Sequence, residues 1–140
     1  MRAGNTMSSS RRPSSSQALI DAHCAPASVS RVFASAAELF GVLSTPLRLR
    51  ILNTICTQER GVNDIVELVH STQPNVSQHL KVLYLAGIVT KRREGNQIYY
   101  RVHNDKAMQL CRTVCTQIAI ELADERAAAA DERPVERSSA

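Results

Sequence analysis

Residues 62–86 contain two short helical patterns separated by a turn of three residues, and this feature constrains the fold most. Val62–Val69 forms the first pattern, His70–Thr72 the turn and Gln73–Ala86 the second pattern. Gly87 follows at the position where a glycine commonly terminates a helix. Ile88 is the apolar residue that favours a Schellman-type helix end. Two short helices joined so tightly are typical of a helix-turn-helix, in which the second helix lies in the major groove of DNA.

The second of these helices has a largely uncharged polar face. At 100° per residue, Ser77, Gln78 and Lys81 fall opposite Val76 and Leu80. Asn and Gln bond bidentately to adenine, Ser bonds to several base edges or to phosphate, and Lys reaches guanine or the backbone. We therefore predict that this helix binds DNA through the following residues: Gln73, Asn75, Ser77, Gln78, His79 and Lys81. His79 is expected to brace the helix or to contact a phosphate.

Residues 88–94 and 97–102 predict two strands, because they flank Gly95-Asn96, a strong hairpin signal. Just before the turn stand three basic residues: Lys91, Arg92 and Arg93. From Lys81 to Arg101 the chain has five basic side chains and one acidic side chain, Glu94, although its total net charge is only +4. This local concentration predicts a hairpin wing that rests on DNA phosphates, which adds affinity with little sequence information.

The remaining segments complete a chain that is mainly α with a β-hairpin wing, in the order α-α-α-α-β-β-α. Helices are predicted from Ser28 to about Leu43, from Pro46 with Thr45 as its cap, and from Asp105 to about Ala127. We expect residues 1–27 to be a flexible arm, 28–127 a single domain for DNA binding and dimerisation, and 128–140 a disordered tail.

Composition excludes several other classes of protein. The chain lacks a run near 18 apolar residues and an apolar N-terminal run, so we expect a cytoplasmic protein. In that compartment four cysteines indicate thiols, metal ligands or redox sensing more than disulfides. With 4% aromatic residues, a stacking surface for single strands is not expected. The sequence has no C-x-x-C motif and no Gly-rich phosphate loop, which argues against an enzyme.

Three separated segments resemble signature segments of the ArsR/SmtB family of winged-helix repressors: Leu43–Leu52, Gln73–Val89 and Arg92–Val102. They occur in the order of the family, with its S-x-H-L-x-x-L pattern beginning at Ser77. The resemblance implies a homodimer formed through the first and last helices. It also implies an inverted-repeat operator in double-stranded DNA, repression of nearby genes, and release of the DNA when an inducer binds.

The resemblance further implies an inducer, which in this family is usually a metal or metalloid ion and in some members a thiol oxidant or persulfide. The C-x-C metal site of the third helix is absent here, because Arg60–Val66 contains no cysteine. The positions that match the zinc site of the last helix cannot rebuild it, since they are Asn104, Lys106, Gln117 and Ile120.

The cysteines are the remaining candidates for the sensor. Cys111 and Cys115 are four residues apart on a predicted helix, so their thiols share a face and could ligate a soft ion such as As(III). The persulfide-sensing branch has one cysteine on the second helix and one on the last. Cys56 and Cys115 each lie about one turn from the matching positions and could face each other. We predict a thiol sensor of Cys56, Cys111 and Cys115, modified as a persulfide or disulfide or binding a metalloid, with Cys24 as a further ligand across the dimer.

Other interpretations remain open for the cysteines and for the whole chain. A buried free cysteine behaves as a small apolar residue, so the four thiols can be structural. The chain is then a constitutive winged-helix module that binds DNA or protein and senses nothing. A thiol-dependent enzyme is the third alternative.

Overall fold

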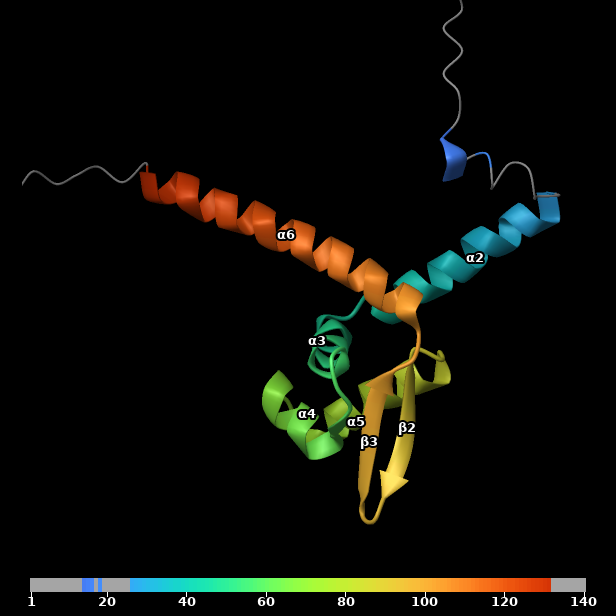
Figure 1. Ribbon diagram of the computed structural model, residues 1–140, viewed down its shortest axis with the longest axis vertical. Helices are drawn as coiled ribbons and strands as arrows, with labels where there is room; N and C mark the ends of the chain where they lie inside the picture. The colour runs from blue at the N-terminus through green and yellow to red at the C-terminus, as the bar shows by residue number, and fades with distance from the viewer. Residues whose placement is uncertain (1–13, 17, 19–25, 132–140) are drawn as a thin grey trace, which may run out of the picture. The chain divides into compact units, whose positions relative to one another are not determined.

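The computed structural model describes residues 14–16, 18 and 26–131. Contacts divide the chain into two units, residues 1–38 and 39–140, with the boundary inside the first long helix. The elements, most of which are labelled in Figure 1, are α2 (Pro26–Leu43), α3 (Pro46–Ile55), β1 (Arg60–Gly61), α4 (Val62–Val69), α5 (Gln73–Leu85), β2 (Val89–Glu94), β3 (Gln97–Val102) and α6 (Asp105–Asp131).

The described part of the first unit is helical. The N–H of Ala18 donates to the carbonyl of Ser14 at 3.0 Å, which closes one helical turn inside the segment predicted to be an arm. α2 begins at Pro26, two residues before the predicted start, in agreement with the preference of proline for the first turn of a helix. Within α2, Val32 and Phe33 are exposed, by 50% and 65%. Cys24 and most of the predicted arm lie outside the described residues.

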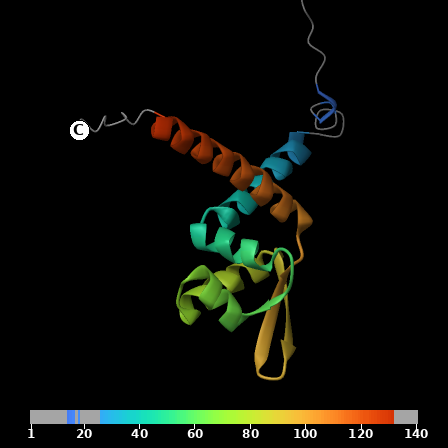
Figure 2. The ribbon, with the colours of Figure 1, turned by 60° about the vertical axis from the view of Figure 1, so that its left-hand side comes forward.

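The second unit is built on a small cluster of helices next to a β-hairpin, which Figure 2 shows from the side. α3, α4 and α5 contribute most of its core, and the hairpin and the start of α6 complete it. The residues that are fully buried are Ile51, Leu52, Ile55, Ile65, Val69, Val76, Leu80, Leu83, Ile88 and Val89. Each helix therefore presents an apolar stripe to one common core.

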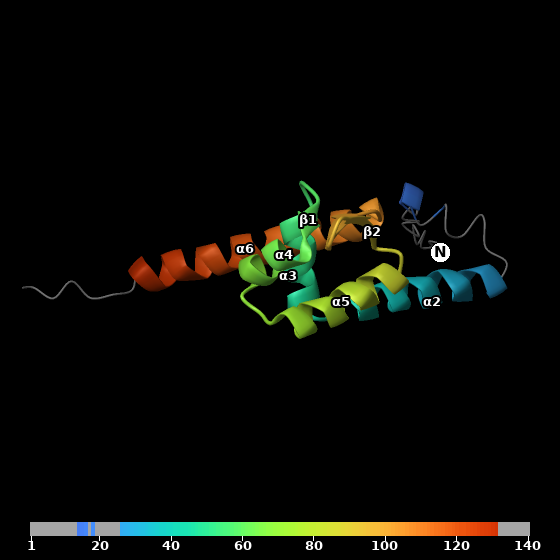
Figure 3. The same ribbon diagram turned by 90° about the horizontal axis from the view of Figure 1, so that it is seen from below.

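α4 and α5 are joined by the predicted tight turn, as Figure 3 shows from below. His70 makes this turn in the left-handed conformation, with φ of 51°. Gly87 directly follows Ala86, the C-cap of α5, and its φ is 70°. The N–H of Ile88 donates to Leu83 and that of Gly87 to Tyr84, both at 3.0 Å, which is the Schellman motif. The predicted helix-turn-helix and its glycine end are confirmed.

Helix starts are only partly as predicted. Thr45 and Thr72 stand in the extended conformation before α3 and α5, and a proline follows in the first turn of each helix. Neither threonine makes a side-chain capping bond. The proline, which lacks an N–H and has a preset φ, fits this position without such a bond.

The sheet has three antiparallel strands in the order β1-β3-β2. β2 and β3 form the predicted hairpin, with Arg92 opposite Tyr99 and Thr90 opposite Arg101. β1, which we did not predict, adds two residues to the other edge of β3 and pairs Gly61 with Tyr99. Two residues are too few to show a strand period in the sequence.

α6 begins with a side-chain cap and runs further than predicted. The N–H of Ala107 donates to Oδ1 of Asn104 at 3.1 Å, so this asparagine caps the helix. The helix continues to Asp131 because Ala127–Ala130 are strong helix formers, so residues 128–131 are helical where we expected a disordered tail. Residues 132–140 lie outside the described part.

The fold is therefore mainly α with a hairpin wing, as predicted. None of the described helices combines the length and the apolar character that a membrane-spanning helix needs. Two consecutive helical segments that meet at a bend, residues 28–43 and 46–55, reach that length and apolar character only when they are taken together.

Candidate DNA-binding surface

α5 separates an anchored apolar face from an open polar face. Val76, Leu80 and Leu83 are 0% exposed, and they fix the helix to the core. The polar residues predicted to bind DNA are exposed, namely Gln73, Asn75, Ser77, Gln78 and Lys81. Asn75 also donates from Nδ2 to the hydroxyl of Ser71 at 3.0 Å, which ties the turn to the first residues of α5. The arrangement gives a rigid helix whose outer side can enter a groove.

His79 differs from the other predicted contacts because it is half-buried. Its Nδ1 lies 3.4 Å from Nη1 of Arg48. The same guanidinium donates to the carbonyl of Gly41 at 3.3 Å and to that of Val42. Arg48 therefore links the end of α2 to α5, and His79 takes part in that link. Arg48 lies in one of the three segments that resemble the family, but no pattern in the sequence predicts its bracing role.

The three basic residues of the wing do not share one face of the hairpin, because side chains alternate along a strand. Nζ of Lys91 lies 4.4 Å from the ring centre of Tyr84, on the side of α5. Arg93 points to the same face of β2 and donates from Nε to the carbonyl of Gly95 at 3.1 Å, at the turn. Arg92 is on the opposite face, where β3 contributes Tyr99 and Arg101. Lys91 and Arg93 therefore lie on the face of the hairpin that is turned toward α5, and Arg92 lies on the opposite face.

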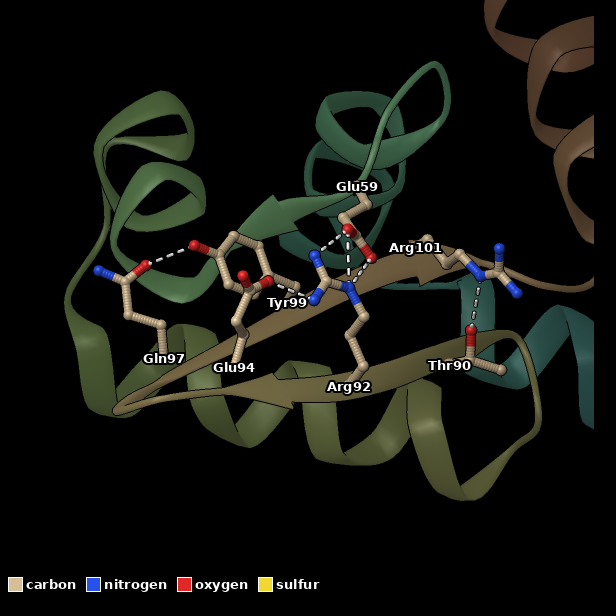
Figure 4. A network of polar contacts seen from close by, with 7 residues as sticks. All are labelled: Glu59, Thr90, Arg92, Glu94, Gln97, Tyr99 and Arg101. Atoms are coloured by element: carbon tan, nitrogen blue, oxygen red, sulfur yellow. Dashed lines mark hydrogen bonds and ion pairs between the residues drawn. The ribbon is translucent and has the colours of Figure 1, made fainter.

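Arg92 is held by two carboxylates, as Figure 4 shows. Its Nε donates to Oε1 and Oε2 of Glu59 at 2.8 and 2.9 Å, and its Nη1 donates to Glu94. Its guanidinium carbon lies 4.8 Å from the ring centre of Tyr99. The hydrogen bond from Arg92 holds the pKa of Glu59 below its usual range, and the two carboxylates raise the pKa of Arg92. Arg92 is therefore not the free cation that the sequence analysis expected.

Four exposed cations remain around the polar face and the hairpin: Lys81, Lys91, Arg93 and Arg101. Arg101 makes one long bond, from Nε to the hydroxyl of Thr90 at 3.4 Å. In the sequence Arg101 belongs to the positive region from Lys81 to Arg101, but no pattern there distinguishes it from the other cations. These side chains can bind phosphates without first breaking an ion pair with a carboxylate.

Two of the predicted sensor cysteines lie together beside an apolar hollow of about 190 Å³ between the end of α2, α3 and α6. Burial raises the pKa of the Cys111 thiol, and the neighbouring Cys115 adds to this shift. Cys115 is exposed. The hollow is lined by Phe40, Leu43, Ser44, Leu49, Leu110, Cys111, Val114 and Cys115.

Cys56 lies at a different place. It follows the end of α3, donates from Sγ to the carbonyl of Asn53 at 3.0 Å, and borders a second hollow with Met108 and Arg112. Cys56 and Cys115 line different hollows, Cys56 beside the first turns of α6 and Cys115 beside the end of α2 and the start of α3. Within the residues described, no three His, Cys, Asp or Glu side chains gather where they could hold a metal ion.

Comparison with known proteins agrees with this geometry. Residues 45–91 match the family model described as bacterial regulatory protein, arsR family. The chain is 41% identical over 68 residues to the HTH-type transcriptional repressor SmtB of Mycobacterium tuberculosis. This aligned segment covers 49% of this chain and 50% of that protein. It is 39% identical over 85 residues to the biofilm growth-associated repressor of Xylella fastidiosa, covering 58% of this chain and 75% of that protein. The chain thus spans about half the length of the M. tuberculosis relative.

Solved structures give the same result. The transcriptional repressor BigR from Xylella fastidiosa superposes with a TM-score of 0.60 at 33% identity, over 66% of this chain and 95% of that one. The homodimeric winged helix-turn-helix domain of Mb0332 from Mycobacterium bovis superposes with a TM-score of 0.56 at 27% identity, over 66% and 83%. The relatives are named as regulators of transcription, and the family is not one of enzymes. The chain belongs to the ArsR/SmtB family of winged helix-turn-helix regulators.

Proposed function

We propose that this protein is a transcriptional repressor that binds double-stranded DNA in the cytoplasm by placing α5 in the major groove. One observation carries the proposal. α5 is fixed to the core by Val76, Leu80 and Leu83, which are 0% exposed, while its polar residues are open to solvent. The major groove admits an α-helix and displays a distinct donor and acceptor pattern for each base pair.

The residues of this surface divide into two roles. Gln78, Ser77 and Asn75 lie in the first turns of α5, the part of a recognition helix that contacts base edges, and their side chains bond to bases without net charge. Lys91 and Arg93 on the wing, with Gln73 and Lys81 on α5, contact phosphates. Phosphate contacts fix position and add salt dependence, and base contacts specify the sequence.

The protein acts as a homodimer on an inverted repeat. One recognition helix contacts only a few base pairs, and a two-fold dimer doubles the contact with a fixed spacing. Both α2 and α6 expose large apolar side chains that a partner could cover, namely Val32, Phe33 and Phe40 on α2 and Val114, Ile118 and Leu122 on α6. The similarity to the homodimeric Mb0332 domain supports this assembly.

The DNA-binding proposal is tested with two variants in fluorescence anisotropy titrations, on DNA from upstream of the protein's own gene and on a random duplex. Gln78→Ala should weaken binding to the upstream DNA by roughly 5- to 150-fold and leave random DNA nearly unchanged, because it removes a base contact. Arg93→Ala should weaken binding to both duplexes and lower the slope of log affinity against log salt by about one.

Equal losses on both duplexes for both variants would contradict these roles. Leu85→Ala is the matched control on α5, since Leu85 is 73% exposed and belongs to neither set.

The repressor is released by an inducer that acts on the Cys111 and Cys115 pair, either an oxidant or reactive sulfur species or a soft ion such as As(III). The pair supports this proposal because the two thiols line one hollow next to α2 and the start of α3, so a change at either sulfur acts on helices of the second unit. Cys56 is a separate candidate, and Cys24, expected as a further ligand across the dimer, lies outside the described residues.

The sensor proposal is tested by adding polysulfide, peroxide and arsenite in turn to the DNA complex. The variant with both Cys111→Ser and Cys115→Ser should stay on the DNA under the treatment that releases the wild type. Cys56→Ser should be released normally. If the double variant is released like the wild type, the pair is not the sensor, and if no treatment releases the wild type, the proposed thiol-based release is wrong.

A further inference from the structure

We propose that Glu59 is a positioning residue for the wing, which holds the β2–β3 hairpin in place for DNA through Arg92. This inference rests on the proposed DNA-binding function and adds a residue that lies outside α5 and outside the hairpin. Arg92 then serves to fix the hairpin, while Lys91 and Arg93 remain available for DNA.

The contacts of Glu59 connect segments that are 33 residues apart in sequence. Glu59 directly precedes β1, and β1 pairs with β3, whose other neighbour is β2. Its carboxylate therefore reaches past β3 to Arg92 on β2, and the ring of Tyr99 on β3 lies under the same guanidinium (Figure 4). The interaction thus links the residue before β1 to β2 across β3.

The segment that carries Glu59 is itself attached to α3. Arg60, the next residue, donates from Nε to the carbonyl of Thr54 at 2.7 Å. Thr54 belongs to α3, which has Ile51, Leu52 and Ile55 in the core. The position of Glu59 is therefore fixed relative to the core, and its bonds to Arg92 fix the hairpin relative to the same core.

The hairpin needs such an attachment because little else anchors its outer part. In β2, Val89 is buried and Thr90 half-buried, and every residue from Lys91 to Glu94 is exposed. A two-stranded hairpin is marginally stable alone, and β1 adds only two residues to the sheet. In the described residues, the ion pairs are those of Arg92 with Glu59 and with Glu94, and the Glu59 pair is the one that leaves the hairpin.

The charges around Arg92 also differ from those around Lys91 and Arg93. Two carboxylates contact one guanidinium, so a phosphate would have to displace at least one of them. The side chains of Arg92 and Glu59 are 50% and 30% exposed, which makes this pair a weak contributor to global stability. Its effect should appear in the position and mobility of the wing.

Two explanations predict opposite signs for Glu59→Gln. Removal of a negative charge within a Debye length of DNA, about 8–10 Å, strengthens binding by electrostatics alone. Loss of a positioning residue weakens it. We expect operator affinity to fall by about two- to fivefold, the range that an exposed ion pair can supply. Glu94→Gln is the matched control, because it removes the same charge and another Arg92 partner, but Glu94 lies within the hairpin. It should leave binding unchanged or slightly tighter.

A double-mutant cycle adds a readout for Arg92. Arg92→Gln should weaken operator binding to the same extent as Glu59→Gln with an unchanged salt slope, and the double variant should be no weaker than either single variant. If Glu59→Gln binds as tightly as the wild type or more tightly, the proposal is overturned. It is also overturned if Arg92→Gln lowers the salt slope by about one, because Arg92 is then a direct phosphate contact.

Hydrogen exchange of the free protein keeps this test separate from the proposed function. Amides of residues 90–100 should exchange faster in Glu59→Gln than in Glu94→Gln, whether or not the protein binds DNA. If the wild type binds no DNA but this difference is present, the proposed function fails and the attachment of the wing stands. Equal exchange in the two variants overturns the attachment.

Discussion

Leu80→Ala tests whether the inward face of α5 supports the fold while its outward face binds DNA. Leu80 is 0% exposed and belongs to the same buried cluster as Val76 and Leu83. Removal of its isobutyl group loses the transfer free energy of the buried carbons and leaves a cavity, which together cost about 2–5 kcal/mol. Domains of this size are stable by about 5–15 kcal/mol, so the variant should still fold.

Thermal unfolding followed by circular dichroism measures this effect. One kcal/mol shifts Tm by roughly 4–8 °C in a domain of 60–100 residues, so we expect Tm to fall by at least about 8 °C. Protein concentration must be equal in all samples, because dimerisation makes Tm depend on it. Leu85→Ala is the control, since the same substitution on the same helix at a side chain 73% exposed should change stability by no more than about 0.5 kcal/mol. If the two variants shift Tm equally, our assignment of the faces of α5 is wrong.

Three further predictions concern the turns and the wing. Gly87→Ala should destabilise by about 1–2 kcal/mol in urea titrations, because φ of 70° is unfavourable for a residue with a Cβ although open space surrounds the site; an unchanged midpoint would contradict this. His70→Gly should instead stabilise, by up to about 1 kcal/mol, because His70 has φ of 51°, and a loss of stability would show that its side chain matters more than its backbone. The pKa of Glu59 is lowered in the folded protein, so its interaction with Arg92 is fully present above the pKa of an unfolded glutamate, about 4.3, and is lost as pH falls through the lower folded value. The difference in hydrogen exchange between the wild type and Glu59→Gln should therefore persist from pH 7 to about pH 5 and shrink in stronger acid; a difference that vanishes at pH 6 would refute this.

The sequence predicted the helix-turn-helix and its ends because these depend on local rules. Apolar spacing gave the inward residues Val76, Leu80 and Leu83, and Gly87 marked the left-handed end of α5. The hairpin followed from Gly95-Asn96 between two β-rich runs. These signals need no knowledge of distant residues, and the structure confirms them.

The features that the sequence analysis missed depend on contacts between distant segments. Lys91, Arg92 and Arg93 are adjacent in the sequence and were predicted to act together. Side chains alternate along a strand, however, so Arg92 lies on the face opposite to the other two. Its partner Glu59 could not be found, because β1, which brings Glu59 to the sheet, is only two residues long. The expected approach of Cys56 to Cys115 also depends on a contact between distant segments, that of α3 with α6, and it stays a prediction.

The central claim is that this protein reads a specific DNA sequence with α5 as a dimer. The most direct test is hydroxyl-radical footprinting of the purified wild-type protein on the DNA upstream of its own gene, with a random duplex as competitor. We predict two protected half-sites on one face of the DNA, about one helical turn or a multiple of it apart and related by a two-fold axis, that survive an excess of competitor. Protection that spreads evenly along the DNA and disappears with the competitor would contradict the claim.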